Sequence, residues 1–253
     1  MINIIVVSHN NIADVKTILE ELAEKNELYT LWVRDNVNDS VLKDLCAQYE
    51  NVNYFAGIRR EGFAQNNNIM VEHIISTTTI SDDDYLLFMN PDAFITKERM
   101  LSLCSLLAIK KLDMFTVDLY ADAAYSVRDP SIRKFPSLKT FLSSFLFNSN
   151  SSIVNRDLIQ EQDDLDWCAS SFFGIKLNHF KTLNGFDSRY FMYCEDVDLC
   201  YRAKRKGIKL SYIPEIKAIH YAQQNSKRLF TRNFCWHVKS AMLFLWVKYK
   251  LSR

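Results

Sequence analysis

Residues 85–92 read Tyr-Leu-Leu-Phe-Met-Asn-Pro-Asp, an apolar run that stops at a polar turn. An uninterrupted apolar run of this length is typical of a strand buried on both faces of a parallel sheet. Pro91 has no backbone N–H and a fixed φ, so it ends the strand and orients the residues beside it. The stretch therefore predicts a central strand, with Asn90 and Asp92 just beyond its carboxyl end.

The same alternation of apolar runs and helical spacing fills the first 110 residues. Apolar runs over 3–7, 29–33 and 53–55 precede the run over 85–89, and segments of helical period over 15–22, 41–49 and 62–75 separate them. Alternating strands and helices predict an α/β fold with a doubly wound sheet. The pattern becomes less regular after residue 115, where residues 143–152 are rich in Ser and Asn and predict a loop.

Composition and charge narrow the class of protein. The chain has 253 residues, 48% of them hydrophobic, which indicates one large domain or a domain with a small appendage. Its net charge of +1 excludes a general polyanion binder. Its first residues lack the basic segment of a signal peptide, and no apolar stretch approaches the roughly 20 residues that span a bilayer. The six cysteines form no C-x-x-C pair, so we expect free thiols in a reducing cytoplasm and no zinc site.

The direction of the strands indicates which acidic residues lie at the ligand-binding end of the sheet and could bind a metal. In open α/β sheets, ligands bind outside the carboxyl ends of the strands. Residues 82–84 are three aspartates that precede their strand, so we interpret them as a solvated turn, whereas Asp92 follows the same strand. His220 ends a later apolar run, and a carboxylate with an imidazole suits Mg²⁺ or Mn²⁺ with positions left for phosphate. A turn at Asp92 and a structural histidine at 220 remain the alternatives.

Asp35 and Asn36 also follow a predicted strand, beside the loop of Ser8 and His9 that follows the first one. A carboxylate here suits the N–H of a pyrimidine base, with the Ser8–His9 loop against the nucleoside. An Asx-turn that leads into the next helix explains the pair equally well.

Three carboxylates, Glu195, Asp196 and Asp198, lie at the predicted start of a helix. Acids in a first helical turn are common because they complement the helix dipole. Here an aromatic run over 190–193 precedes them, which puts a carboxylate at the edge of an apolar wall. Such a carboxylate can act as general base toward a sugar hydroxyl.

Joined in order, these motifs resemble those of family 2 glycosyltransferases with the GT-A fold, and among them the bacterial O-antigen rhamnosyltransferases. The resemblance runs from about residue 2 to residue 250, and the ordered set is far more specific than any single motif. It rests on the first strand with Ser8-His-Asn10, Asp35-Asn36, Gly62-Phe-Ala-Gln-Asn-Asn-Asn68, Phe88-Met-Asn-Pro-Asp92, Trp167-Cys-Ala-Ser-Ser171, Leu183-Asn-Gly-Phe-Asp187, Tyr190-Phe-Met-Tyr-Cys-Glu-Asp-Val-Asp-Leu-Cys200 and Ile219-His-Tyr221.

The resemblance implies a fold and a division of the chain. It implies a GT-A, Rossmann-like mixed sheet, mainly parallel and flanked by helices, over 1–226. Residues 1–115 would form the nucleotide-binding half and 116–226 the acceptor and catalytic half. A basic amphipathic helix would follow over 227–253.

The resemblance also implies a role for each matching residue. Asn90 stands where many relatives have the first aspartate of Asp-x-Asp, so the metal site has one charge fewer. The implied roles are nucleotide binding by Ser8, His9, Asp35, Asn36, Asn67 and Asn90; binding of Mg²⁺ or Mn²⁺ by Asp92 and His220; the general base, Asp196, with Glu195 the lesser candidate; and acceptor binding by Trp167 and Asp187.

The expected activity is transfer of a sugar with inversion, from dTDP-L-rhamnose to an acceptor linked to polyprenyl diphosphate, in synthesis of the O-antigen of lipopolysaccharide. A transferase that uses UDP-galactofuranose or a UDP-hexose is the rival. A nucleotidyltransferase is disfavoured, because the loop after the first strand is not a Gly-rich phosphate cradle. The third alternative, a non-catalytic scaffold in a polysaccharide assembly complex, is disfavoured by the presence of Asp92, Asp196 and His220 together.

The carboxy-terminal segment over 227–253 is basic and contains no acidic residue. Tryptophan and leucine interleaved with the basic residues predict a helix that lies on an anionic membrane. Helical spacing of Phe234, Val238 and Leu245 predicts packing against the core equally well. The expected location is therefore the cytoplasm, at the inner face of the plasma membrane, with no nucleic acid as partner.

Overall fold

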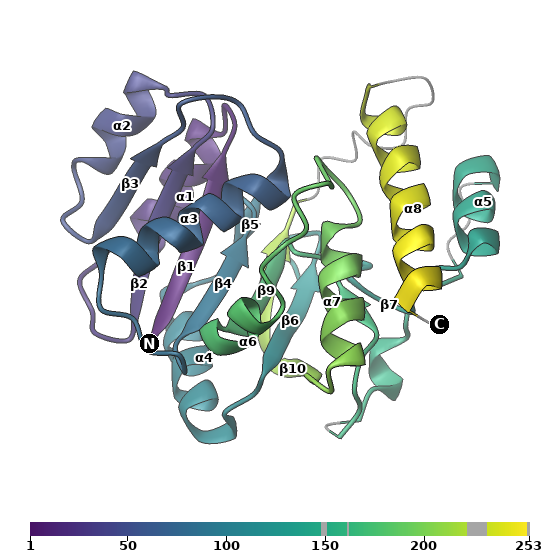
Figure 1. The fold of residues 1–253 in the computed structure, drawn as a ribbon. Helices are drawn as coiled ribbons and strands as arrows, with labels where there is room; N and C mark the ends of the chain where they lie inside the picture. Colours follow the sequence, from purple (N-terminus) through teal and green to yellow (C-terminus); the bar gives the residue numbers. More distant parts are fainter. Residues whose placement is uncertain (148–150, 161, 222–231, 252–253) are drawn as a thin grey trace.

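The computed structural model describes residues 1–147, 151–160, 162–221 and 232–251 (Figure 1). Its helices and strands, in chain order, are β1 (Ile2–Ser8), α1 (Ile12–Leu22), β2 (Tyr29–Asp35), α2 (Ser40–Cys46), β3 (Val52–Ala56), α3 (Phe63–Thr77), β4 (Tyr85–Met89), β5 (Ala93–Phe94), α4 (Lys97–Lys110), β6 (Met114–Tyr120), β7 (Ile132–Arg133), α5 (Leu138–Phe147), a 3₁₀ helix (Arg156–Leu158), β8 (Trp167–Cys168), β9 (Phe172–Lys176), α6 (Leu177–Thr182), α7 (Glu195–Arg205), β10 (Leu210–His220) and α8 (Arg232–Leu251).

One mixed sheet of eight strands runs through both halves of the chain, in the order β3-β2-β1-β4-β9-β6-β10-β5. β1 to β4 are parallel to one another, as the sequence predicts, because helices return the chain between them. β9 inserts antiparallel between β4 and β6. Its Gly174 is required there, because a Cβ at this position would lie 2.1 Å from the ring of Phe115.

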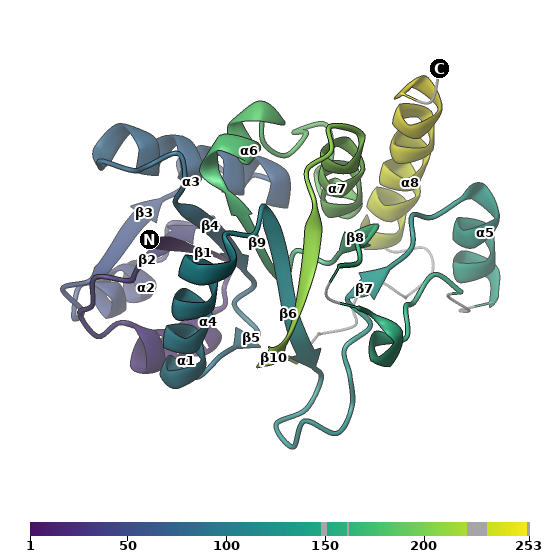
Figure 2. The same cartoon turned by 90° about the horizontal axis from the view of Figure 1, so that it is seen from below.

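Helices cover both faces of the sheet (Figure 2). The apolar side chains of α1, α2 and α4 pack on one face, and those of α3, α6, α7 and α8 pack on the other. The four predicted strands and the three predicted helices of the first half are all present, within a few residues of their predicted bounds. The mixed, mainly parallel sheet expected from the resemblance is confirmed.

α5 corrects the predicted loop over 143–152, because the helix continues to residue 147. Phe141 is buried and joins the core on the α7 side of the sheet. Ser143 donates its hydroxyl to the Thr140 carbonyl oxygen at 3.0 Å, so its polar group is satisfied inside the helix. Serine content alone therefore gave the wrong secondary structure for residues 143–147, whereas residues 148–150 lie outside the described residues and 151–152 form a turn.

The predicted carboxy-terminal helix is present as α8, beside α5 in both views (Figures 1 and 2). Ala241, Phe244 and Val247 are buried, and the Phe244 ring meets the Tyr201 ring of α7 edge to face, with centroids 5.8 Å apart. One face of α8 thus packs on the core, whereas the basic residues of 227–231 lie outside the described residues. Within the described part of the chain, no helix is long and apolar enough to cross a membrane.

Candidate active site

Two adjoining cavities lie at the carboxyl ends of the parallel strands, where ligands bind in open α/β sheets. The smaller cavity, of about 240 Å³, is bordered by the loops that follow β1, β2 and β4. The larger one, of about 430 Å³, is bordered by α5, β8 and the start of α7. Phe63, Asn90 and Met192 line both cavities, so the two spaces meet at the end of β4.

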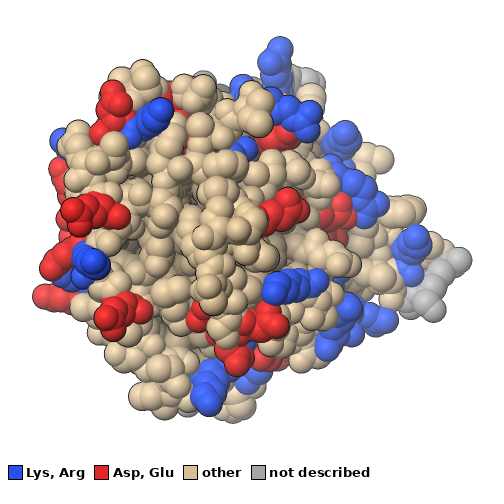
Figure 3. Space-filling model, turned by 60° about the vertical axis from the view of Figure 1, so that its left-hand side comes forward, with Lys and Arg blue, Asp and Glu red and all other residues tan. Residues whose placement is uncertain are grey.

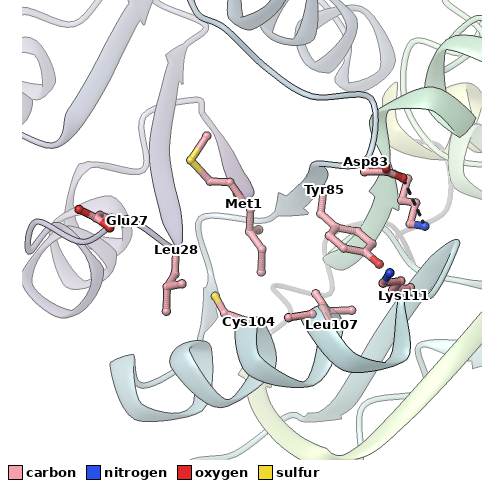
Figure 4. A pocket seen from close by; sticks show the side chains of 11 residues that line it. Met1, Glu27, Leu28, Asp83, Tyr85, Cys104, Leu107 and Lys111 are labelled. Atoms are coloured by element: carbon pink, nitrogen blue, oxygen red, sulfur yellow. Dashed lines mark ion pairs between the residues drawn. The ribbon is translucent and has the colours of Figure 1, made fainter.

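A third hollow lies at the opposite end of the sheet, where Met1, Tyr85 and Lys111 surround it (Figure 4). Asp83 lies at its edge and pairs with Lys176 at 3.7 Å. The three aspartates over 82–84 therefore form a turn at the amino end of β4, as predicted, and each pairs with a cation. This end of the sheet is not the ligand-binding end of the fold.

Pairing of β5 with β10 brings Asp92 next to His220. His220 lies opposite Ala93 in this antiparallel pair, and the Tyr221 N–H donates to the Asp92 carbonyl oxygen at 3.1 Å. The Nε2 atom of His220 consequently lies 3.5 Å from Asp92 Oδ1. Nδ1 of the same ring lies 3.0 Å from Oδ2 of Asp129, which is buried. Asp129 thus fixes the ring with Nε2 toward Asp92.

The two carboxylates control protonation of His220. Burial lowers the pKa of this imidazole, but the hydrogen bonds and charges of Asp129 and Asp92 outweigh burial and raise the pKa to about 9. A cation that binds Nε2 has to displace a proton. A histidine held by a carboxylate through one nitrogen, with the other nitrogen free to coordinate, is the usual arrangement of a metal-binding histidine.

Asp92 and His220 could therefore supply two ligands to a divalent ion. In the residues that the structure describes, no group of three or more His, Cys, Asp and Glu side chains is arranged to hold an ion. Mg²⁺ and similar ions at phosphate-transfer sites commonly take one or two protein ligands, and water and phosphate oxygens fill the other positions. The donor set at the end of β4 fits that type of site.

A sharp turn before α7 aims its first carboxylates. Tyr193 has φ 71° and Cys194 has φ 64°, a conformation that residues other than glycine rarely adopt. The turn rests on the start of α3, where the Phe63 N–H donates to the Phe191 carbonyl oxygen at 2.9 Å. A Cβ at Gly62 would lie 2.1 Å from that oxygen, so glycine allows this close approach.

The three carboxylates at the start of α7 have different surroundings. Asp198 is fully buried and accepts from Arg202 Nε at 2.7 Å, which identifies it as structural. Asp196 lines the larger cavity, and its Oδ2 accepts from the Ser170 N–H at 3.2 Å. Glu195 lines the same cavity but is 5% exposed, and its Oε2 has no hydrogen-bond partner among the described residues.

Glu195 and Asp196 differ in how strongly their surroundings shift their pKa values. It raises the pKa of Glu195 well above its usual range, and the charge of Asp196 adds to the effect. Burial also raises the pKa of Asp196, but three backbone N–H groups and the Arg133 guanidinium oppose it. The anionic form is therefore better supported at Asp196 than at Glu195.

Of the two residues expected on the acceptor side, only Trp167 lines the larger cavity. Its indole N–H donates to the Lys134 carbonyl oxygen at 2.9 Å, and Arg133 lies over its ring, 5.4 Å from the centroid. Asp187 borders neither of the two cavities and pairs with Arg189 instead. Asp187 thus holds its own loop together.

Asp35 is fully buried, and its carboxylate is already occupied. Its Oδ1 accepts the N–H groups of Val37 and Asn38, at 2.9 and 3.1 Å. Its Oδ2 accepts the Asp39 N–H at 2.6 Å and the Tyr54 hydroxyl at 2.8 Å. A carboxylate offers about four acceptor positions. This geometry is that of the Asx-turn, the second interpretation of the sequence, and it leaves Asp35 shaping the loop beside the smaller cavity.

The other residues expected to bind nucleotide surround the smaller cavity. His9, Asn36, Asn67 and Asn90 line it directly. Ser8 is buried beneath it, where its carbonyl oxygen accepts the Asn36 N–H at 2.9 Å.

The smaller cavity also contains a cation that the motifs did not indicate. Arg60 lines it, and the structure shows no ion pair for Arg60 among the described residues. The preceding Arg59 pairs with Glu61 and is largely exposed. Arg60 also helps burial to lower the pKa of His9. Its signal in the sequence was the pair of arginines at 59 and 60, directly before Glu61 and Gly62.

Comparison with known proteins decides the family. The chain is 39% identical over 252 residues to rhamnosyltransferase WbbL of Escherichia coli, and the match covers 100% of this chain and 95% of the relative. The protein belongs to the bacterial rhamnosyltransferase family. The resemblance expected from the ordered motifs is thereby confirmed, and the protein is a glycosyltransferase. No protein-family model matches the chain.

Other relatives of this rhamnosyltransferase are more distant. An N-acetylglucosaminyl-diphospho-decaprenol L-rhamnosyltransferase of Mycobacterium tuberculosis is 30% identical over 123 residues, 46% of this chain and 40% of the relative. The fold matches that of GalNAc-T7, solved with UDP, GalNAc and Mn²⁺, with a TM-score of 0.65 at 13% identity. That match covers 98% of this chain and 48% of the solved chain, and it shows that the fold is GT-A.

Proposed function

We propose that the protein transfers L-rhamnose from dTDP-L-rhamnose to a sugar carried on polyprenyl diphosphate, in synthesis of an O-antigen or related surface polysaccharide. One observation carries the proposal: a cavity with Asp92 beside His220 adjoins a cavity with Asp196 in its wall. The nucleotide sugar occupies the smaller cavity, and the acceptor occupies the larger one. The relatives support this choice of donor and acceptor class.

Asp196 acts as general base in a single displacement. It removes the proton from the acceptor hydroxyl while the oxygen attacks the anomeric carbon, and the configuration at that carbon inverts. The Ser170 N–H holds the carboxylate in place. Glu195, whose burial favours the neutral form, lies beside Asp196 without sharing this task.

Asp92 and His220 bind the divalent ion, Mg²⁺ or Mn²⁺. A bound ion neutralises the charge that builds on the leaving nucleoside diphosphate. Asn90 places an amide where a second carboxylate would add charge, so the site relies more on His220 and on the orientation that Asp129 gives it. Manganese in the solved GalNAc-T7 supports an ion of this class.

Arg60 contributes to nucleotide binding through its charge. Arg60→Met is expected to weaken dTDP binding by about tenfold or more, because a charge-assisted hydrogen bond to phosphate is lost. Calorimetric titration of dTDP in the presence of Mn²⁺ measures the change. Arg59→Met is the matched control from the same loop, since Arg59 already pairs with Glu61. Equal effects of the two substitutions would show that Arg60 has no special contact with the nucleotide.

The donor is tested with a panel of nucleotide sugars and a synthetic N-acetylglucosaminyl diphosphate lipid. We expect transfer from dTDP-L-rhamnose, and greater thermal stabilisation by dTDP than by UDP. Transfer from UDP-galactofuranose or a UDP-hexose alone would replace the proposed donor with the rival one. GalNAc-T7, whose fold is similar, was solved with UDP, so UDP-sugar donors belong in the panel. If no nucleotide stabilises the protein and no donor is used, the scaffold interpretation holds.

We propose that α8 holds the enzyme on the inner face of the plasma membrane, where a lipid-linked acceptor is found. The helix contains Arg232 and three lysines but no acidic residue. Lys239, Met242 and Trp246 are exposed at helical spacing on one side of it. Charge is also unevenly spread: on the face in Figure 3, most Lys and Arg lie toward the right and most Asp and Glu toward the left and lower centre. Such a distribution suits one-sided contact with anionic lipid.

A double substitution tests the membrane contact without disturbing the core. Met242 and Trp246 are 68% and 51% exposed, so Met242→Ser with Trp246→Ser is expected to lower co-sedimentation with anionic vesicles at an unchanged melting temperature. Ile109→Ser, at an 82% exposed position on α4, is the control. Unchanged sedimentation of the double variant would rule out α8 as the anchor.

A further inference from the structure

The larger cavity contains an arginine whose charge acts on Asp196 but whose hydrogen-bond donors the catalytic step does not use. Arg133 ends β7 and lines the cavity, with its guanidinium over the Trp167 ring. Its Nε donates to the Pro130 carbonyl oxygen at 2.6 Å. Among the described residues, no carboxylate forms an ion pair with Arg133, and no hydrogen bond engages its two terminal nitrogens. Neither nitrogen is a buried unpaired atom of the described chain, so both remain accessible to a ligand.

A partly buried, unpaired cation is unfavourable without an anionic ligand. Burial lowers the pKa of Arg133, and the negative charges of Asp196 and Asp129 offset this only in part. Its neighbour in the cavity, His237, adds no second charge, because burial and Arg133 lower the pKa of His237 to about 4. Arg133 therefore presents a single planar fork of donors, the geometry that matches phosphate oxygens.

The wall of the larger cavity combines charged and apolar groups. Asp196 and Arg133 both line it. Phe141 of α5 and His237 of α8 line it as well. Leu138 and Leu142 of α5 are 60% and 49% exposed, and α5 lies beside α8, which carries the exposed Met242 and Trp246 (Figures 1 and 2). A base and a cation thus share one cavity with two neighbouring helices that carry exposed apolar side chains.

We propose that Arg133 binds the diphosphate of the acceptor, and that the lipid leaves the site between α5 and α8. The inference rests on the proposed function, because it takes the acceptor to be a sugar diphosphate lipid. Such a molecule joins a sugar, a diphosphate and a hydrocarbon, the three groups that Asp196, Arg133 and the exposed leucines suit. Arg60 in the smaller cavity serves the diphosphate of the donor.

A binding experiment tests the proposal without a donor. Geranyl diphosphate and geraniol are titrated by calorimetry into the wild type, Arg133→Met, Arg133→Lys and the control Arg128→Met. Arg128 lies in the same segment but pairs with Asp157 at 2.7 Å outside the cavity. We expect Arg133→Met to weaken geranyl diphosphate binding by about tenfold or more and Arg133→Lys to weaken it less, because the lysine keeps the charge but not the fork. Arg128→Met should bind like the wild type.

Two further measurements separate the alternatives. In transfer assays, Arg133→Met should raise the KM of an N-acetylglucosaminyl diphosphate lipid by about tenfold more than the KM of a neutral alkyl N-acetylglucosaminide. Equal losses on both acceptors would mean that Arg133 acts through Asp196 and would overturn the proposal. Weaker dTDP binding by Arg133→Met would place the donor diphosphate there and would also overturn it. If the wild type binds geranyl diphosphate but transfers sugar from no donor, the proposed function is refuted. The proposed diphosphate site at Arg133 is not.

Discussion

Asp196→Asn is expected to lower kcat by about 10³-fold, the size of effect usual for loss of a general base. Asparagine keeps the size of the side chain and can still lie next to the Ser170 N–H, but its amide cannot accept the proton of the acceptor hydroxyl. Nucleotide binding should not change, since Asp196 lines the larger cavity and not the smaller one. Transfer kinetics and titration with dTDP together measure this separation.

Glu195→Gln is the matched comparison, because it replaces the adjacent carboxylate by its neutral isostere. Burial already favours the neutral form of Glu195, so this change should cost far less activity. If Glu195→Gln loses as much activity as Asp196→Asn, the two roles are shared or reversed.

The pH profile gives an independent check of the base. Burial raises the pKa of Asp196, although backbone hydrogen bonds and Arg133 limit the rise. A base works only when deprotonated, so kcat/KM should fall as the pH is lowered through this pKa, at a pH above the usual aspartate range. The fall in kcat/KM at low pH reports the titration of the coupled Glu195–Asp196 pair, not of either residue alone. A profile that stays flat down to the usual aspartate range would contradict a buried base.

The sequence predicted the first half of the sheet because its strands are uninterrupted apolar runs. The runs of β1, β2 and β4 are buried on both faces, and the polar residues that stop them, such as Asn90 and Asp92, mark the ligand-binding end. The second half carries less signal. β7 and β8 have only two residues each, and β9 inserts antiparallel between strands that come earlier in the chain. Such pairing depends on contacts between distant residues, which a local pattern does not encode.

The candidate site was predictable only where a motif marks it. Asp92, Asp196 and His220 follow recognisable strand or helix boundaries, and all three border the joined cavities. Asp129 and Arg133 lie in an irregular segment, so nothing local distinguished them from surface residues. Their importance comes from the fold, which brings Asp129 to His220 and Arg133 into the cavity of Asp196.

At Asp35 the sequence left two interpretations open. The family resemblance suggested contact with the base of the nucleotide, whereas the structure fills its acceptor positions with three backbone N–H groups and a tyrosine hydroxyl. The sequence favoured the turn and the binding site equally. Only the positions of the backbone N–H groups distinguish them, and they follow from tertiary structure.

Asp92→Ala is expected to lower kcat by about 10²- to 10³-fold, because stabilisation of the leaving diphosphate by a divalent ion contributes several kcal/mol. It should also raise the Mn²⁺ concentration that gives half-maximal activity. His220 alone then remains to bind the ion, and its proton competes for Nε2 because Asp129 still acts to raise the pKa of the ring. Calorimetric titration of Mn²⁺ in the presence of dTDP measures the affinity directly. Asp129→Asn should weaken Mn²⁺ binding by about 10- to 100-fold, the usual cost of losing a carboxylate that orients a metal-binding histidine.

Asp82→Ala is the matched control for Asp92→Ala, since it removes an aspartate from the other end of the same strand. Asp82 is exposed and pairs with Lys181 at 2.7 Å, so its loss should cost no more than about 1 kcal/mol of stability. Strand polarity alone distinguishes the two positions in the sequence. If both variants lose metal affinity to the same extent, or if neither does, then Asp92 is not a metal ligand and the end of β4 binds the diphosphate without an ion held by this carboxylate.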